Sequence, residues 1–131
     1  MKIIHRQKEA LEKLILLISE IHIYVDAIIV EGSRDVKSIR SLGCSAEIEV
    51  LNHVKISDFD LAERISSKFR RVVILTDFDE AGLKLNQKFS SLLERNGTMV
   101  ETGIRHRFGR LMTMIGVHAI ESVDNIKKEL Y

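Results

Sequence analysis

The chain has 131 residues, 45% of them hydrophobic, and its 20 Lys and Arg nearly balance 19 Asp and Glu, for a formal net charge of +1. This composition is typical of a single globular domain. It excludes a disordered chain and nucleic-acid binding by overall charge alone, so any such contact needs a local basic patch. One cysteine excludes an internal disulfide, and no long uncharged apolar run or apolar leader is present, so we expect a cytoplasmic protein without a membrane span.

The first predicted element is an amphipathic helix from about Arg6 to His22. Leucine and isoleucine recur there at helical spacing, at Leu11, Leu14, Ile15, Ile18 and Ile21. This apolar stripe could pack on a sheet or on a second copy of the protein. Residues 1–24 are therefore assigned to an N-terminal helix.

Short apolar runs then alternate with amphipathic segments. The runs are rich in β-branched residues, which suits strands that are buried on both faces. They span Val25–Val30, Ala46–Leu51, Arg71–Leu75 and Thr98–Ile104. The segments between them have helical periodicity, with Ser33 and Ser57 as possible N-caps.

Strands that alternate with helices predict right-handed βαβ units and a parallel sheet. Winding in both directions from the first strand gives the strand order 2-1-3-4. We therefore predict an α/β, Rossmann-like fold with a four-stranded parallel sheet flanked by helices. A single domain over 1–131 would comprise the N-terminal helix (1–24), a core (25–104) and a C-terminal extension (105–131).

Three carboxylates follow predicted strands: Glu31 after the first, and Asp77 and Asp79 after the third. In the order 2-1-3-4 these two strands are neighbours, so the three side chains would meet in one crevice at the topological switch point. Asp77 and Asp79 would face the same side of an extended backbone and repel each other unless a cation lies between them. Oxygen ligands suit Mg²⁺ or Mn²⁺. Alternatively, an Asp after a strand caps the next helix, and Asp79 stands at such a position.

Two motifs carry these carboxylates, IIVEGSRD around Glu31 and VVILTDFDEAG around Asp77 and Asp79. Together they resemble the Toprim domain of topoisomerases, primases and several nucleases, which has a Glu after its first strand and an Asp-x-Asp after its third. The form TDFDEAG is similar to the ribonuclease that matures 5S ribosomal RNA and to small stand-alone Toprim proteins. A later segment, Gly116-Val117-His118-Ala119, is similar to a Gly-Val-Glu-His-Ala of that ribonuclease, without its Glu.

The resemblance implies a role for each acidic residue. Asp77 and Asp79 would hold Mg²⁺. Glu31 would be the general acid/base, which activates the water or protonates the leaving group, or it would take part in a second metal site. Basic residues near such a site would hold phosphate groups, and the candidates are Arg34, Lys37, Lys84, Arg105 and Arg107. Each of these could also belong to a solvated charged surface.

The resemblance further implies a Mg²⁺-dependent protein that processes nucleic acid, as a nuclease that hydrolyses phosphodiester bonds in RNA or DNA. The alternative is a module that binds nucleic acid or a partner protein with little catalysis of its own. A phosphatase of the haloacid-dehalogenase type also has an Asp-x-Asp after a strand, but it needs that motif on its first strand. A homodimer or a larger complex is expected, because a symmetric dimer is the commonest assembly and would double a weak basic patch.

Overall fold

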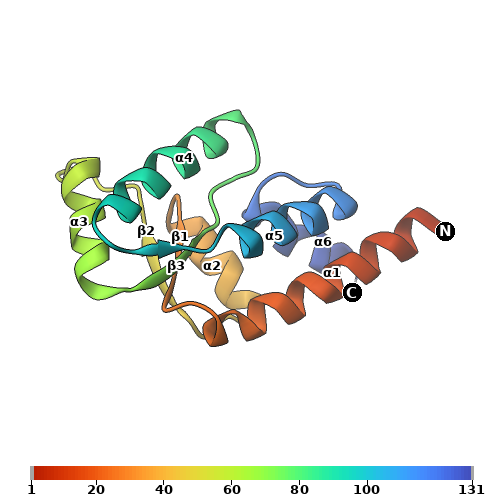
Figure 1. The fold of residues 1–131 in the computed structure, drawn as a ribbon. Helices are drawn as coiled ribbons and strands as arrows, with labels where there is room; N and C mark the ends of the chain where they lie inside the picture. Colours follow the sequence, from red (N-terminus) through yellow and green to blue (C-terminus); the bar gives the residue numbers. More distant parts are fainter. Residues whose placement is uncertain (1, 131) are drawn as a thin grey trace.

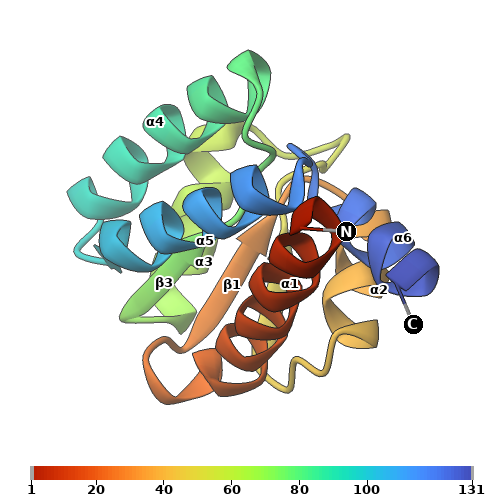
Figure 2. The same ribbon diagram turned by 90° about the vertical axis from the view of Figure 1, so that its right-hand side faces the viewer.

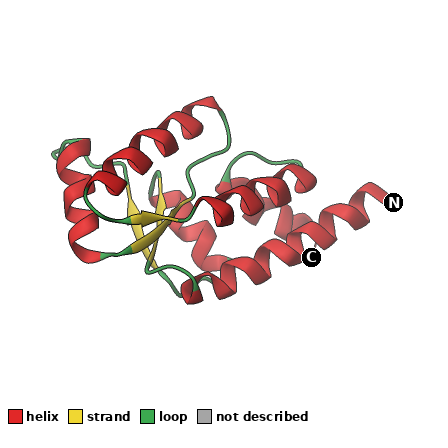
Figure 3. Ribbon diagram, viewed as in Figure 1, coloured by secondary structure: helices red, strands yellow, loops and turns green. Residues whose placement is uncertain are grey.

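The computed structural model describes residues 2–130, with side chains from His5 onward. Figure 1 shows the path of the chain, and Figure 3 shows a small sheet surrounded by helices. In chain order the elements are α1 (Lys2–Glu20), the 3₁₀ turn η1 (Ile21–Ile23), β1 (Ala27–Val30), α2 (Ser33–Ser41), β2 (Glu47–Val50), α3 (Asp58–Lys68), β3 (Arg71–Ile74), α4 (Glu80–Arg95), β4 (Met99–Val100), α5 (Thr102–Ile115) and α6 (Ile120–Leu130).

The sheet is parallel and has the order β2-β1-β3-β4, which confirms the predicted topology. Ala27 in β1 is aligned with Glu47 in β2 and with Val72 in β3, so β1 lies between its two neighbours. All four residues of β1 are buried, because helices cover both faces of the sheet. This is why its sequence is a continuous apolar run and not an alternating one.

Successive residues of β1 face two different hydrophobic cores. Ile28 and Val30 belong to a core that also contains side chains of α1, α2, α5 and α6. Ala27 and Ile29 belong to the second core, which α3 and α4 complete on the other face. Figure 2 shows α1 running beside α5, and α6 beside α2. The apolar stripe predicted for the N-terminal helix is therefore buried within the chain itself.

The segment after β4 differs from its prediction. The fourth strand was expected to span Thr98–Ile104, but β4 contains only Met99–Val100 and α5 begins at Thr102. The reason is that Phe108, Met112 and Ile115 recur at helical spacing and are buried against the core with α1. Burial of this stripe favours a helix over the whole of Thr102–Ile115. None of the helices in residues 2–130 is long and apolar enough to cross a membrane.

An acidic candidate site at the ends of β1 and β3

The two acidic motifs meet at the carboxyl ends of the neighbouring strands β1 and β3. Glu31 directly follows β1, and Asp77 lies in the loop between β3 and α4. The backbone N–H of Asp77 donates a hydrogen bond of 2.9 Å to Oε1 of Glu31. Residues that are 46 positions apart in the sequence are thus joined directly, as the strand order predicts.

A pocket of about 610 Å³ opens at this edge of the sheet. The loop between β1 and α2, the start of α3, α4 and the start of α6 all contribute to its wall. Its acidic residues are Glu31, Asp35, Asp58, Asp77 and Glu121, and Arg34 is the basic residue that lines it. Arg34 lies 3.9 Å from Glu121, and Asp58 is ion-paired with Lys88 on α4. The pocket therefore has an excess of negative charge.

Burial and the neighbouring negative charges raise the pKa of two carboxyl groups in the pocket. Burial raises the pKa of Asp77 to about 6, and the nearby charges of Glu31, Asp35 and Asp79 add to the effect. A backbone hydrogen bond from Ile120, the first residue of α6, acts in the opposite direction on Asp77. The pKa of Asp35 is also raised, mainly by burial and against a hydrogen bond from the Gly32 N–H. A cation in the pocket would relieve the cost of ionising these groups.

Asp79 occupies a different place from the other two predicted carboxylates. It is the N-cap of α4, and its Oδ1 accepts a 2.7 Å hydrogen bond from the Gly82 N–H. Its charge reaches Asp77, but its side chain does not line the acidic pocket. Within residues 2–130, no three His, Cys, Asp or Glu side chains are arranged to hold a metal ion. The three predicted metal ligands are close to one another without forming a ready-made metal cage.

The loop that carries Asp77 is held tightly against α4. A Cβ atom on Gly82 would lie 1.9 Å from the Asp77 carbonyl oxygen, so a glycine is required there. In addition, Thr76 Oγ1 donates a 2.7 Å hydrogen bond to the Gly82 carbonyl oxygen. The backbone of Asp77 is therefore fixed by packing before any ligand binds.

Arg105 has a structural position that the sequence did not reveal. Its side chain is buried and donates to the carbonyl oxygens of Ile74 and Thr76, at 2.9 and 3.0 Å. The guanidinium also lies 4.2 Å from the centre of the Phe78 ring. Burial lowers the pKa of Arg105 to about 10, although Glu31 and Asp77 favour the charged form. Arg105 thus holds the backbone of β3 and of the acidic loop in place, and its contact with phosphate stays a prediction.

The spacing within α5 gave a usable signal for Arg105. It precedes Phe108 by three positions, and therefore lies on the stripe that α5 turns inward. The other predicted phosphate contacts are exposed. Arg34 lines the acidic pocket, whereas Lys37, Lys84 and Arg107 do not, and Lys84 is paired with Glu80 at 3.4 Å.

The start of α6 contributes to the site in a way that the sequence-based site did not include. The Phe78 N–H donates a 2.8 Å hydrogen bond to the carbonyl oxygen of His118, and Glu121 lines the acidic pocket. With the Ile120 hydrogen bond, these contacts bring the connection between α5 and α6 against the acidic loop. The similarity noted for Gly116–Ala119 was the sequence signal for this connection.

A parallel sheet of this order, with a Glu after β1 and an Asp-x-Asp after β3, defines a class of α/β proteins. A family model described as the Toprim domain matches residues 26–111, and the chain belongs to the Toprim family. It is 38% identical over 112 residues to a UPF0292 protein of Pyrococcus abyssi, covering 84% of this chain and 78% of that protein. It is 33% identical over 130 residues to a UPF0292 protein of Methanocaldococcus jannaschii, covering 96% and 99%.

The fold is also found in a solved structure described as a putative protein from Aquifex aeolicus. The TM-score is 0.62 and the sequence identity is 25%, over 88% of this chain and 95% of that chain. The family match ends at residue 111, before α6 begins at Ile120. The acidic loop therefore lies within the matched range, whereas α6, which contacts it, does not.

Proposed function

We propose that the protein is a Mg²⁺-dependent nuclease that hydrolyses phosphodiester bonds in RNA or DNA, and that Glu31 and Asp77 are at its reaction centre. The observation that carries this proposal is the direct hydrogen bond between the Asp77 backbone and Glu31, inside a pocket lined by further carboxylates. Membership of the Toprim family, a family of nucleic-acid-processing proteins, supports it.

The residues present fit a hard divalent cation that takes only some of its ligands from the protein. The donors are carboxylate oxygens, which Mg²⁺ and Mn²⁺ accept. Burial and the neighbouring acidic groups raise the pKa of Asp77, which means that its ionised form is disfavoured. A bound cation would stabilise that ionised form. Mg²⁺ in particular keeps several waters and is commonly held by one or two carboxylates and a substrate phosphate. A pocket without a complete metal cage is therefore compatible with Mg²⁺.

Each residue has a defined part in the proposed reaction. When bound, the cation would supply charge to stabilise the transition state and would lower the pKa of the attacking water. Asp77 would hold the cation, and Asp79 would be available through the oxygen that does not cap α4. Glu31 takes a proton from the water or gives one to the leaving oxygen. Arg34, at 3.9 Å from Glu121, is free to exchange this weak pair for a phosphate of the substrate.

Cleavage of end-labelled RNA and DNA hairpins tests this proposal. Purified protein is incubated with Mg²⁺, Mn²⁺ or EDTA, and the variants Glu31→Gln and Asp77→Asn are compared with wild type. We expect metal-dependent cleavage that falls at least about 100-fold in both variants. Asp60→Asn is the matched control, because Asp60 is an exposed carboxylate of α3 outside the acidic pocket. Cleavage that persists in EDTA or in both variants would overturn the proposal.

A second candidate is a module that binds nucleic acid or a partner protein with little turnover. Two observations favour it: Asp79 is engaged as a helix cap, and no metal cage is formed within residues 2–130. Both candidates predict cation binding if Asp77 is a ligand. A cation at tenfold its dissociation constant would stabilise the fold by about 1.4 kcal/mol, and a thermal melt would measure this. Stabilisation lost in Asp77→Asn, without cleavage by wild type, would favour the binding module.

A further inference from the structure

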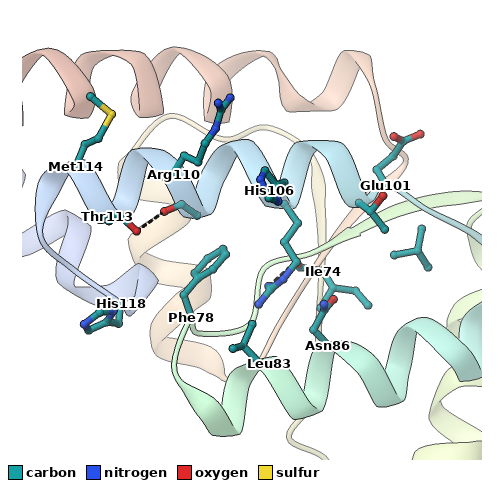
Figure 4. A pocket seen from close by; sticks show the side chains of 14 residues that line it. Ile74, Phe78, Leu83, Asn86, Glu101, His106, Arg110, Thr113, Met114 and His118 are labelled. Carbon is teal, nitrogen blue, oxygen red and sulfur yellow. Dashed lines mark hydrogen bonds between the residues drawn. The ribbon is translucent and has the colours of Figure 1, made fainter.

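A second cavity lies on the other side of the loop that carries Asp77. This groove has a volume of about 790 Å³ and runs between α4 and α5. It shares no lining residue with the acidic pocket. Figure 4 shows Leu83 and Asn86 on α4, Phe78 between α4 and α5, and His106 and Arg110 on α5, with the Arg110 side chain directed away from α4.

The helical spacing of α5 explains the mixed character of the groove. Phe108 points inward and is buried away from the groove, whereas the buried Arg105 and the exposed His106 and Arg110 line it. From α4, Leu83 lines the opposite side and is 48% exposed. Met114 is similarly 53% exposed at one end. The groove thus combines exposed apolar walls with a basic rim.

Two basic side chains of the groove are available to a ligand. Within residues 2–130, neither the His106 nor the Arg110 side chain has a hydrogen bond or an ion pair. The acidic residue of the groove, Glu101, is instead paired with Arg71 at 3.3 Å. A ligand that matches this surface has a flat apolar body and a negative charge, as a nucleotide does.

The position of Phe78 connects the groove to the acidic pocket. Asp77 lines the acidic pocket and the next residue, Phe78, lines the groove, so the two cavities lie on opposite sides of one short loop. We propose that the groove binds one nucleotide of the strand whose phosphodiester lies at the acidic pocket. Its base packs against Leu83 and Phe78, and its phosphate faces His106 and Arg110. This inference rests on the proposed function for the kind of ligand, and a volume of about 790 Å³ is ample for one nucleotide.

Fluorescence anisotropy with short labelled single-stranded RNA and DNA in EDTA tests this inference. Arg110→Ala and His106→Ala should each weaken binding about fivefold, because a charge-assisted contact to phosphate is lost. Leu83→Ala should weaken binding about fivefold, because the apolar surface that the base would cover is lost. Leu83 is half exposed, so this variant should fold normally. Arg64→Ala is the matched control, because Arg64 is exposed on α3 and lines neither cavity.

An abasic oligonucleotide of the same length separates base packing from charge. Arg110→Ala should weaken binding of the abasic strand as it does the intact strand, whereas Leu83→Ala should leave binding of the abasic strand unchanged. The inference is overturned if wild type binds neither strand, or if Arg64→Ala weakens binding as much as Arg110→Ala. It is also overturned if Leu83→Ala alters only self-association in sedimentation velocity, which would make the groove a protein interface.

The binding test is independent of the cleavage test. It uses EDTA, so it needs neither a cation nor turnover, and a protein without nuclease activity can still pass it. Binding through the groove without cleavage would therefore overturn the proposed nuclease alone, and cleavage without these groove effects would overturn the nucleotide site alone.

Discussion

The close contact between Gly82 and the acidic loop makes Gly82→Ala an informative substitution. The new Cβ would lie 1.9 Å from the carbonyl oxygen of Asp77 and 2.5 Å from its carbonyl carbon. Both are backbone atoms, so no side-chain rotation can relieve the overlap. The start of α4 and the Asp77 loop must separate by at least 1.1 Å before the closest contact reaches 3.0 Å.

The size of the effect follows from the contacts that this separation breaks. Overpacking a rigid site typically costs about 1–3 kcal/mol. The hydrogen bonds from Thr76 to the Gly82 carbonyl and from the Gly82 N–H to Asp79, both 2.7 Å, would each lose about 1 kcal/mol. Alanine regains about 1 kcal/mol of helix propensity over glycine. We expect a net loss of about 3 kcal/mol in the free energy of unfolding.

Urea unfolding followed by circular dichroism measures this loss. Gly103→Ala is the matched control, because Gly103 also lies in a helix, α5, and a Cβ there meets nothing within 4 Å. This control should be unchanged or more stable by up to about 1 kcal/mol. If Gly82→Ala proved as stable as Gly103→Ala, then α4 would not be packed on the Asp77 loop as described, and the account of a pre-fixed site would be wrong.

Two further predictions concern the charged groups behind and within the acidic pocket. Arg105→Met should lower the free energy of unfolding by about 3 kcal/mol, since buried carbonyl oxygens lose a charged donor. Arg107→Met, at an exposed position, should change it by less than about 0.5 kcal/mol. Equal effects of the two substitutions in urea unfolding would contradict the supporting role of Arg105. The folded-state pKa of Asp77, about 6 against 3.8, means that folding takes up a proton between these values, so in EDTA stability should fall as pH rises from about 4 to 6. The difference, on the order of 1 kcal/mol after solvent screening, should be smaller in Asp77→Asn, and identical pH profiles for the two proteins would refute the assignment.

The fold was predictable because its main signals are local. Each buried strand is a short run of β-branched residues, and each helix has a periodic apolar stripe, so the alternation of strands and helices can be seen without the structure. The strand order then follows from general rules for parallel sheets. The one misassigned stretch, Thr98–Ile104, is short and contains residues that suit either state. Its conformation is decided by the burial of the α5 stripe against α1.

The candidate site was predictable in part for the same reason. Glu31 directly follows β1 and Asp77 lies in the loop that follows β3, so the strand order places them together. Asp79 illustrates the limit of this reasoning, because its spacing from Asp77 suits both a metal ligand and a helix cap. The structure places it as the cap of α4, with one oxygen engaged by Gly82.

By itself, the amino-acid sequence determined the parallel sheet, its order and the meeting of Glu31 with the Asp77 loop, because periodicity and position after a strand are properties of the local chain. Only the tertiary structure decided the role of Arg105, the approach of α6 to Asp77 and the groove between α4 and α5. These features depend on which helices pack beside each other and on how deeply a side chain is buried. Both depend on contacts between segments that are far apart in the sequence and exclude water only when they pack together, so the sequence of one segment does not determine them.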